Sequence, residues 1–379
     1  MAKRRLKVGT GGFKGALLSA LIIASLIAPL LLISAEAAWG QDIEWVRQFG
    51  TPGYDMAWRV AVDTSGNAYV AGFISGALPG QAYLGGSDAF VRKYDGFGNE
   101  LWTRQFGTSA WDVAQDVVVD DLGNIYVSGA VGDALPGQAY LGGGDAFVRK
   151  YDGFGNELWT RQFGTSDGDI AVVVAVDASG NIYVAGVTGG VFPGQSSSGG
   201  PDAFIRKYDA SGNELWTRQF GSSSTDWAEG VAVDASGNVY VSGYVDGALP
   251  GQTFLGGWSD AFVRKYDASG NELWTRQFGS SESDEAWSVA VDGSSNVYVS
   301  GHVGGALPGQ TFLGGSDAFV RKYDGAGNEI WTRQFGSSSM DDARDVAVDL
   351  SGNVYVAGTT LGVLPEQSSS GNVDAFVRK

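Results

Sequence analysis

The chain has 379 residues, among them 59 Gly, 12 Trp, 15 Tyr and 19 Phe, and its formal net charge is −17. It has no Cys and a single His, which excludes a disulfide framework, thiolate metal sites and multi-histidine metal centres. The negative charge excludes a protein that follows nucleic-acid phosphates. The abundance of Gly and aromatic residues indicates many short strands and tight turns, and argues against a helix bundle or a disordered chain.

The first 37 residues have the pattern of a secretory signal. Basic residues occur in 1–15 without an acid, an apolar run follows over Ala16–Ile33, and Ala35-Glu36-Ala37 supplies the small residues of a cleavage site. We therefore expect 1–37 to be removed and 38–379 to be an acidic protein, secreted or at the cell surface, without membrane contact. An uncleaved N-terminal anchor is the alternative, although the apolar run is short for a spanning helix.

The rest of the chain is an internal repeat. The phrase Trp-x-Arg-Gln-Phe-Gly returns every 57 or 58 residues. It begins at Trp45, Trp102, Trp159, Trp216, Trp274 and Trp331. Each unit contains segments like Asp226–Asp234, Asn238–Gly243, Asp260–Asp267 and Glu272–Gly279, in this order. Their length and their content of Val, Tyr, Phe and Trp predict four strands, with the Trp of the repeated phrase in the core.

Tight hairpins join these segments in pairs. Asp63–Asn67 links the first segment to the second and Asp95–Asn99 links the third to the fourth, both with the pattern Asp-x-x-Gly-Asn. Asp stabilises such a turn through its own backbone, and Gly supplies a positive φ. Ser295 stands where this Gly is expected, so we expect a strained turn there.

Each unit is therefore predicted to be a four-stranded antiparallel meander that is buried on both faces. Radial packing of six such sheets covers the faces and protects the edges. The predicted fold is all-β, a single six-bladed β-propeller over 38–379. The last unit ends after its third strand, and Ile43–Gly50 is an isolated fourth strand, so we expect the N-terminal strand to complete the last blade and close the ring. A linear solenoid is the alternative.

The repeated phrase resembles that of a known family. Asp-x-Ala-x-x-Val-Ala-Val-Asp-x-x-Gly-Asn-x-Tyr-Val-x-Gly, followed by Gly-Gly-x-Asp-Ala-Phe-Val-Arg-Lys, resembles the bacterial SBBP β-propeller repeat over about residues 45–379. The resemblance implies a propeller in an exported or cell-surface protein, and it implies no particular activity. The family name refers to seven blades, whereas this chain has six units.

The connections from second to third strand, and from fourth to first, are expected together on the face opposite the hairpins. Five Trp outside the repeated phrase fall in these connections or at the starts of first strands: Trp58, Trp111, Trp227, Trp258 and Trp287. Aromatic side chains gathered on one face are typical of a platform that stacks on sugars or contacts a protein. We predict these five as ligand-binding residues; the alternative is that each anchors its own loop.

An Asp opens every first strand. These residues are Asp55, Asp112, Asp169, Asp226, Asp284 and Asp341. A ring of carboxylates near the axis could bind Ca²⁺, but packed sheets about 10 Å apart do not share one ion whose ligands lie at about 2.3–2.6 Å. We interpret each Asp as a cap of the turn before it and keep the six as weak candidates for calcium; no other cofactor is expected.

Few other residues carry a signal for chemistry. Arg-Lys pairs such as Arg92-Lys93 recur once per unit, and we interpret them as outer-strand charges that pair with Asp or Glu. His302 occupies a position that other units fill differently. No nucleophile, metal or phosphate-loop motif occurs.

These patterns favour an exported, monomeric, non-enzymatic scaffold for binding or adhesion, with an extracellular polysaccharide or protein as its ligand. Near-identical units favour repeated weak contacts, which avidity makes useful, over one asymmetric pocket. The alternative is an extracellular enzyme, a lyase or glycan hydrolase, with its site at the mouth of the central channel. A pocket that joins His302 to Asp284 or Glu285 would favour this alternative.

Overall fold

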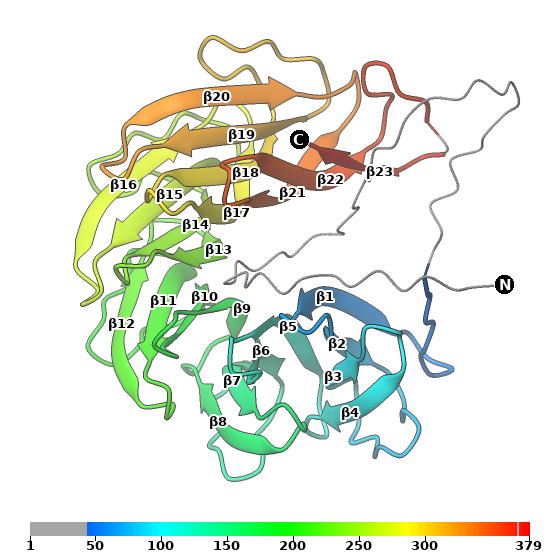
Figure 1. The fold of residues 1–379 in the computed structure, drawn as a ribbon. Coiled ribbons are helices and arrows are strands. Elements are labelled where there is room, and N and C mark those ends of the chain that lie inside the picture. Colours follow the sequence, from blue (N-terminus) through cyan, green and yellow to red (C-terminus); the bar gives the residue numbers. More distant parts are fainter. Residues whose placement is uncertain (1–43, 370) are drawn as a thin grey trace, which may run out of the picture.

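The computed structural model describes residues 44–369 and 371–379, and within them every helix or strand element is a β-strand. The strands form six antiparallel sheets arranged radially around a central axis (Figure 1). This confirms the predicted six-bladed β-propeller. The predicted secretory signal, 1–37, lies outside the described residues. In the part of the chain that the structure describes, no helix is long and apolar enough to cross a membrane.

Each sheet runs in chain order from an innermost to an outermost strand. The innermost strands are β1 (Met56–Val62), β5 (Asp112–Val119), β9 (Asp169–Val176), β13 (Asp226–Val233), β17 (Asp284–Val291) and β21 (Asp341–Val348). The second strands are β2 (Ala68–Ile74), β6 (Ile125–Val131), β10 (Ile182–Thr188), β14 (Val239–Val245), β18 (Val297–Val303) and β22 (Val354–Thr360). The third strands are β3 (Asp88–Tyr94), β7 (Asp145–Tyr151), β11 (Asp202–Tyr208), β15 (Asp260–Tyr266), β19 (Asp317–Tyr323) and β23 (Asp374–Arg378). The outermost strands are β4 (Glu100–Phe106), β8 (Glu157–Phe163), β12 (Glu214–Phe220), β16 (Glu272–Phe278) and β20 (Glu329–Phe335). We number the blades in chain order; blade 6, β21–β23, has three strands.

The Asp-x-x-Gly-Asn hairpins form as predicted. The Asp95 carboxylate accepts the N–H of Phe97 at 2.9 Å and that of Asn99 at 2.8 Å, and Gly98 adopts a φ of 76°. Ser295 takes up the same left-handed conformation with a φ of 59°. Among the described residues, the one other non-Gly residue with positive φ is Glu366, at 62°, which stands where the Leu-Pro-Gly-Gln loops carry Gly.

An aromatic contact joins neighbouring blades. Phe106, at the end of β4, meets Phe147 of β7 edge to face, with the ring centroids 5.5 Å apart. The Arg149 guanidinium lies 4.2 Å from the centroid of the Phe106 ring, which is a cation–π contact. Trp102 is half-buried and donates its indole N–H to the carbonyl of Gly153, in the outer hairpin of blade 2, at 3.2 Å. The outermost strand of one blade therefore holds the next blade.

The interpretation of the Arg-Lys pairs as outer-strand charges is wrong, because these pairs lie on the buried third strands. Arg149 and Lys150 are 5% and 8% exposed. Arg149 does have the expected acidic partner, Glu157 at 3.5 Å, but the Lys150 nitrogen instead lies 5.0 Å from the centre of the Tyr126 ring. Aromatic faces and the long apolar stems of these side chains allow both cations to be buried.

The series of blades is open between β21 and β1. Each innermost strand contacts that of the next blade, from β1–β5 to β17–β21, whereas no comparable contact joins β21 to β1 in the described ranges. Figure 1 shows blades 1 and 6 on either side of this opening. Val60 and Val62 of β1 are 52% and 40% exposed, while their counterparts Val117 and Val119 of β5 are buried. Blade 1 thus presents an uncovered apolar surface toward the opening.

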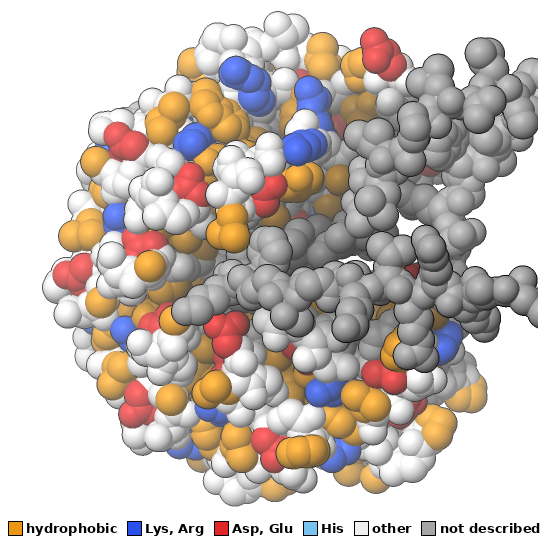
Figure 2. All heavy atoms as spheres, in the orientation of Figure 1, with side chains coloured by type: hydrophobic (Ala, Val, Ile, Leu, Met, Phe, Trp, Pro, Cys, Tyr) orange, Lys and Arg blue, Asp and Glu red, His pale blue; other side chains and the backbone are white. Residues whose placement is uncertain are grey.

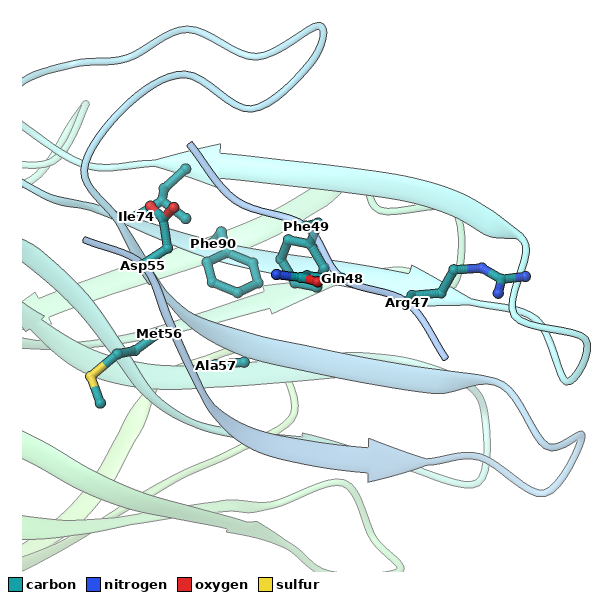
Figure 3. A pocket seen from close by; sticks show the side chains of 8 residues that line it. All are labelled: Arg47, Gln48, Phe49, Asp55, Met56, Ala57, Ile74 and Phe90. Carbon is teal, nitrogen blue, oxygen red and sulfur yellow. The ribbon is translucent and has the colours of Figure 1, made fainter. Parts of the chain in front are cut away.

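Residues 44–50 dock on blade 1 in the way that an outermost strand docks on the following blade. Phe49 meets Phe90 edge to face, with the centroids 5.5 Å apart. Trp45 donates its indole N–H to the carbonyl of Gly96 at 3.2 Å. Figure 3 shows Phe49 beside Phe90 at a cavity of about 260 Å³. The N-terminal segment therefore makes half of the contacts that closure of the ring requires.

The other half belongs to blade 6, where a cavity of about 460 Å³ runs along β23. Its lining includes Leu364. The counterpart in blade 1, Leu78, donates its N–H at 2.9 Å to Gln105 of the outermost strand, and Gln48 is the matching residue of the N-terminal segment. The cavity fits the predicted strand, but residues 44–50 and β23 are not paired in the structure, so the closure stays a prediction.

Closure can be tested by cross-linking. In blade 1, Val91 pairs with Arg104, and the same register places Arg47 opposite Val377. Since the chain has no Cys, the double variant Arg47→Cys, Val377→Cys should form an intramolecular disulfide under mild oxidation. Non-reducing electrophoresis would show a faster-moving monomer, with either single variant as the control. Covalent dimers, or no cross-link, would contradict closure within one chain.

Glycine should stabilise the two strained turns. A non-Gly residue at positive φ costs about 1 kcal/mol, so Glu366→Gly should raise the free energy of unfolding by about this amount. Ser295→Gly should raise it less, because the variant loses the 3.3 Å hydrogen bond from the Ser295 hydroxyl to Asp234. Gly237→Ser, at a φ of 78°, should lower it. Urea unfolding measures all three; a less stable Glu366→Gly variant would show that the turn conformation has been misjudged.

Candidate functional site around the propeller axis

Among the strands of the repeat units, the innermost ones differ most from one unit to the next. The third and outermost strands are near copies, of the types Asp-Ala-Phe-Val-Arg-Lys-Tyr and Glu-Leu-Trp-Thr-Arg-Gln-Phe. Counted from the opening Asp, the innermost strands share Asp at the first residue, Ala at the third and Val at the sixth, while the second, fourth and fifth residues change from blade to blade. We call these three the axial positions.

A β-bulge aims the axial positions at the centre of the propeller. In every blade the register of the innermost strand against its neighbour shifts at the fourth residue, between Ala114 and Asp116 in β5, for example. Such a bulge sets two residues against one and re-aims their side chains. The innermost strand is the end strand of its sheet and lies nearest the axis in Figure 1.

The axial positions are chemically uneven around the ring. Blade 3 contributes only the aliphatic residues Ile170, Val172 and Val173. Blades 4, 5 and 6 contribute aromatic, acidic and basic residues, namely Trp227, Glu229, Glu285, Trp287, Asp342, Arg344 and Asp345. The nearly uniform scaffold therefore carries an asymmetric set of side chains at its centre. On the face of the propeller that Figure 2 shows, acidic and basic side chains are interspersed.

Aromatic pairs mark the axial ends of blades 1 and 4. Trp227 stacks with Tyr244, which lies opposite it in β14; the centroids are 6.4 Å apart and the planes differ by 13°. Trp58 meets Phe73 of β2 edge to face at 5.3 Å. All four rings are half-buried, so each pair keeps aromatic surface available for a ligand.

Blade 5 combines an imidazole, an indole and a carboxylate. Trp287 lies 4.7 Å from the His302 ring and donates its indole N–H to Glu285 at 2.8 Å. The Arg344 guanidinium of blade 6 lies 4.0 Å from the Trp287 centroid. His302 stands opposite Glu285 in the ladder, and burial lowers the pKa of His302, against the charges of Glu285 and Asp342. The structure therefore places His302 beside Glu285, and the pocket around them that would favour the enzymatic alternative stays a prediction.

Carboxyl groups with raised pKa lie near these rings. Burial, and then the charge of Glu285, raise the pKa of Glu229 to about 7. Burial raises the pKa of Asp116 to about 6. The Asp116 carboxylate accepts the N–H of Val174, in the innermost strand of the next blade, at 2.9 Å, and lies 3.8 Å from the Arg59 side chain. The axis therefore holds carboxyl groups whose pKa lies above the ordinary value.

The five Trp predicted to bind ligand fall into two groups at one end of the propeller, and none of them is fully buried. Trp58, Trp227 and Trp287 are axial. Trp111 bridges to Ser87 of the β2–β3 loop, and Trp258, in the β14–β15 loop, is 86% exposed. Three of the five therefore belong to innermost strands and two to loops or strand starts, and ligand binding by these residues on one platform stays a prediction.

The six Asp that open the innermost strands cap the preceding turns. Asp112 accepts the backbone N–H of Thr108 at 2.6 Å and its hydroxyl at 3.0 Å. The equivalent pairs are Thr51–Asp55, Thr165–Asp169, Ser222–Asp226, Ser280–Asp284 and Ser337–Asp341. Over 44–369 and 371–379, no group of three or more His, Cys, Asp or Glu is placed to hold a metal ion. Calcium binding at these Asp stays a prediction.

This arrangement supports two kinds of chemistry. Aromatic faces beside carboxylates are suited to a ligand with many hydroxyl groups, and the acid pair Glu229 and Glu285 is suited to proton transfer. The sequence analysis did not single out Glu229, Tyr244 or Arg344. The signal that marks two of them is the difference among otherwise identical units at the axial positions, which becomes meaningful once the bulge is known to face the axis.

Comparison with known families finds the repeat throughout the chain. A family model named SBBP and described as a beta-propeller repeat matches residues 44–77, 101–129, 158–193, 215–249, 273–302 and 330–365. Together the matched ranges cover more than half of the chain.

Two curated proteins are similar in sequence. The regulatory protein FlaEY of Caulobacter vibrioides is 31% identical over 206 residues, which cover 49% of this chain and 22% of that protein. An uncharacterized WD repeat-containing protein of Acanthamoeba polyphaga mimivirus is 22% identical over 361 residues, which cover 72% of this chain and 26% of that protein. The chain thus spans about a quarter of the length of these relatives.

Solved structures show more distant similarity. A protein of unknown function from Bacteroides caccae is 13% identical with a TM-score of 0.41, over 74% of this chain and 82% of that one. The extracellular domain of a putative one component system from B. thetaiotaomicron is 11% identical with a TM-score of 0.37, over 80% of this chain and 37% of that one.

The raised pKa values of the buried Asp residues predict that the protein loses stability as the pH rises. Burial raises the pKa of Asp112 and Asp169 to about 6, and that of Asp226 and Asp284 to about 7. A carboxyl whose folded pKa lies above the unfolded value of about 4 stabilises the fold below that value, and this contribution is lost as pH rises through the folded pKa. The Tm should therefore fall between pH 5 and pH 8, although the lowered pKa of His302 acts in the opposite direction.

Calorimetry at constant ionic strength measures this dependence. The variant Asp226→Asn should show a shallower fall of the Tm, because one of the titrating groups is gone. A Tm that rises steadily over the same interval would show that these carboxyl groups are ionised in the folded protein.

Proposed function

Because the chain belongs to the SBBP β-propeller repeat family, we propose that it is an exported binding scaffold whose ligand site comprises the axial residues of blades 4 to 6 and the adjoining loops. The observation that carries the proposal is the placement of the variation. In units whose third and outermost strands are near copies, three positions of each innermost strand change from blade to blade, and these strands lie nearest the axis (Figure 1). Export rests on the signal pattern of residues 1–37.

The ligand that fits best is an extracellular polysaccharide. The stacked pair of Trp227 and Tyr244 offers a flat apolar surface to a sugar ring, and Glu229 and Glu285 accept hydrogen bonds from hydroxyl groups. Trp258, exposed in its loop, provides a second contact for a long chain. Contacts at the axis and in the loops would add through avidity. A protein ligand is the alternative partner for the same surface.

A second candidate function is hydrolysis or elimination at the axis, which the pairing of Glu229 with Glu285 favours. Two carboxyl groups are the usual machinery of glycan cleavage. Glu229, with its pKa raised to about 7, would donate the proton, and Glu285, which accepts the indole N–H of Trp287, would be the second carboxyl group. His302 opposite Glu285 would orient it.

The binding function predicts the effect of removing aromatic side chains. In titrations of the mature protein with polysaccharides, followed by tryptophan fluorescence, Trp227→Ala and Trp258→Ala should each weaken binding by about 1 kcal/mol or more. Phe97→Ala is the matched control, because Phe97 is 81% exposed in a hairpin at the opposite end and its loss should leave binding unchanged. Equal effects of all three variants would contradict a site at the axial end.

The same mixtures distinguish the two functions. Mass spectrometry of the polysaccharide after incubation should show intact chains if the protein only binds them. Shortened chains that disappear with Glu229→Gln would establish the enzymatic candidate instead. If the protein bound no polysaccharide but did bind a protein from the cell surface, its ligand would be a protein and not a polysaccharide.

A further inference from the structure

The innermost strands direct backbone amides at the axis. Each is the end strand of its sheet, so alternate N–H groups point away from the neighbouring strand. In blade 4 the Asp234 amide bonds to the Asn238 carbonyl at the hairpin. Hydrogen-bonded and non-hydrogen-bonded pairs alternate along the ladder from that bond. Val231 and Val241 form a non-hydrogen-bonded pair, so the N–H of Val231 points away from β14 and toward the axis. Val289 holds the same position in blade 5.

In blades 2 and 3 a side chain of the protein accepts the corresponding amides. Asp116 Oδ1 accepts the N–H of Val117 at 2.8 Å, and Asp116 Oδ2 accepts the N–H of Val174 of the next blade at 2.9 Å. One carboxylate therefore bridges two innermost strands. Arg59, which is 52% exposed, reaches this carboxylate at 3.8 Å, so the position is accessible to a group that comes from the axis.

Between blades 4 and 5 the residue that corresponds to Asp116 is Gly230. A Cβ on Gly230 would lie 3.1 Å from the nitrogen of Val289 and would also contact the Ser242 hydroxyl. Ser242 is completely buried, and its hydroxyl has no hydrogen-bond partner among the described residues, which is also true of Ser128 and Ser300 at the same position in blades 2 and 5. Between blades 4 and 5, therefore, the described residues supply no side-chain acceptor at the place that the Asp116 carboxylate occupies between blades 2 and 3.

The charges around this place are compatible with an anion. Arg59 and Arg344 are near enough to Glu229, the residue before Gly230, to lower its pKa, while burial and the charge of Glu285 raise it to about 7. The raised pKa of Glu229 and the two nearby cations therefore reduce the negative charge that an incoming anion meets.

We propose that Gly230 marks an oxyanion-binding site, formed by the N–H groups of Val231 and Val289 and the hydroxyl of Ser242, that takes a carboxylate of the ligand. The bound carboxylate bridges blades 4 and 5 as Asp116 bridges blades 2 and 3. A planar group with two acceptor oxygens matches two amides on adjacent strands, because each oxygen meets one donor. Gly230 is required since any side chain there would fill the site.

The site narrows the ligand class. If the proposed polysaccharide function holds, the sugar carries a carboxylate, as a uronic acid does, and its ring lies toward Trp227. This step rests on the proposed function, whereas the oxyanion site itself rests on the backbone amides and the Ser242 hydroxyl.

Sodium formate is the probe that tests the site. In amide NMR of the mature protein, formate should shift the signals of Val231 and Val289 saturably, at one site per chain, while sodium chloride at equal ionic strength should not. Gly230→Asp should abolish the formate response, because its carboxylate occupies the site as Asp116 does in blade 2. Formate that shifts neither signal in the wild-type protein would overturn the proposal.

A second variant keeps the test valid if Gly230→Asp does not fold. Ser242→Ala removes one donor and is compatible with the fold, since Ala185 holds this position in blade 3. It should weaken formate binding about tenfold, whereas Ser128→Ala, the same change in blade 2, should have no effect. Equal responses of the two variants would overturn the proposal.

The outcomes separate this inference from the proposed function. Formate binding without polysaccharide binding would leave the oxyanion site in place and remove the proposed function. Binding of neutral polysaccharides with no response to formate would keep the function and overturn the oxyanion site.

Discussion

The contact between the outermost strand of one blade and the third strand of the next is the interaction on which this propeller depends. A Phe ring meets a second Phe edge to face, and a buried Arg lies over it, as in Phe106, Phe147 and Arg149. The ring pair recurs at 5.5 to 5.8 Å in the following interfaces. The repeated phrase varies little because its Trp, Arg and Phe each have a partner in the next blade, while its Gln holds the loop before the third strand of its own blade. Its Gly is equally constrained, since a Cβ on Gly164 would lie 2.7 Å from the carboxylates of both Asp145 and Asp169.

This constraint divides each blade into a fixed outer part and a variable inner edge. Third and outermost strands are committed to the neighbouring blades, so their residues cannot change without loss of packing. The innermost strand packs through its Ala and Val residues and has its edge toward the axis. The site that we propose lies where packing leaves the residues free to change, because the variable residues of the six innermost strands lie next to the axis.

At the opening between blades 6 and 1, the two sides of this inter-blade contact are both present but are not joined to each other. Phe49 already occupies the place of an outermost-strand Phe on blade 1, while β23 carries the cavity in which such a strand would lie. The exposed Val60 and Val377 belong to surfaces that are covered in the other interfaces. A strand that bound both halves would bury this apolar area, which is the driving force for closure.

The sequence by itself determined the all-β class, the blade boundaries, the hairpins and the positive φ at Ser295, because these depend on local turn chemistry and on a repeat that recurs in one chain. It also indicated that the opening Asp residues cap their turns. It did not determine that Arg149 and Lys150 are buried, since burial of a cation depends on ring faces supplied by other strands. Nor did it select Glu229, Tyr244 and Gly230 as neighbours at the axis. Only the tertiary structure decided this, because the bulge and the radial packing bring together residues that are separated in the chain by whole blades.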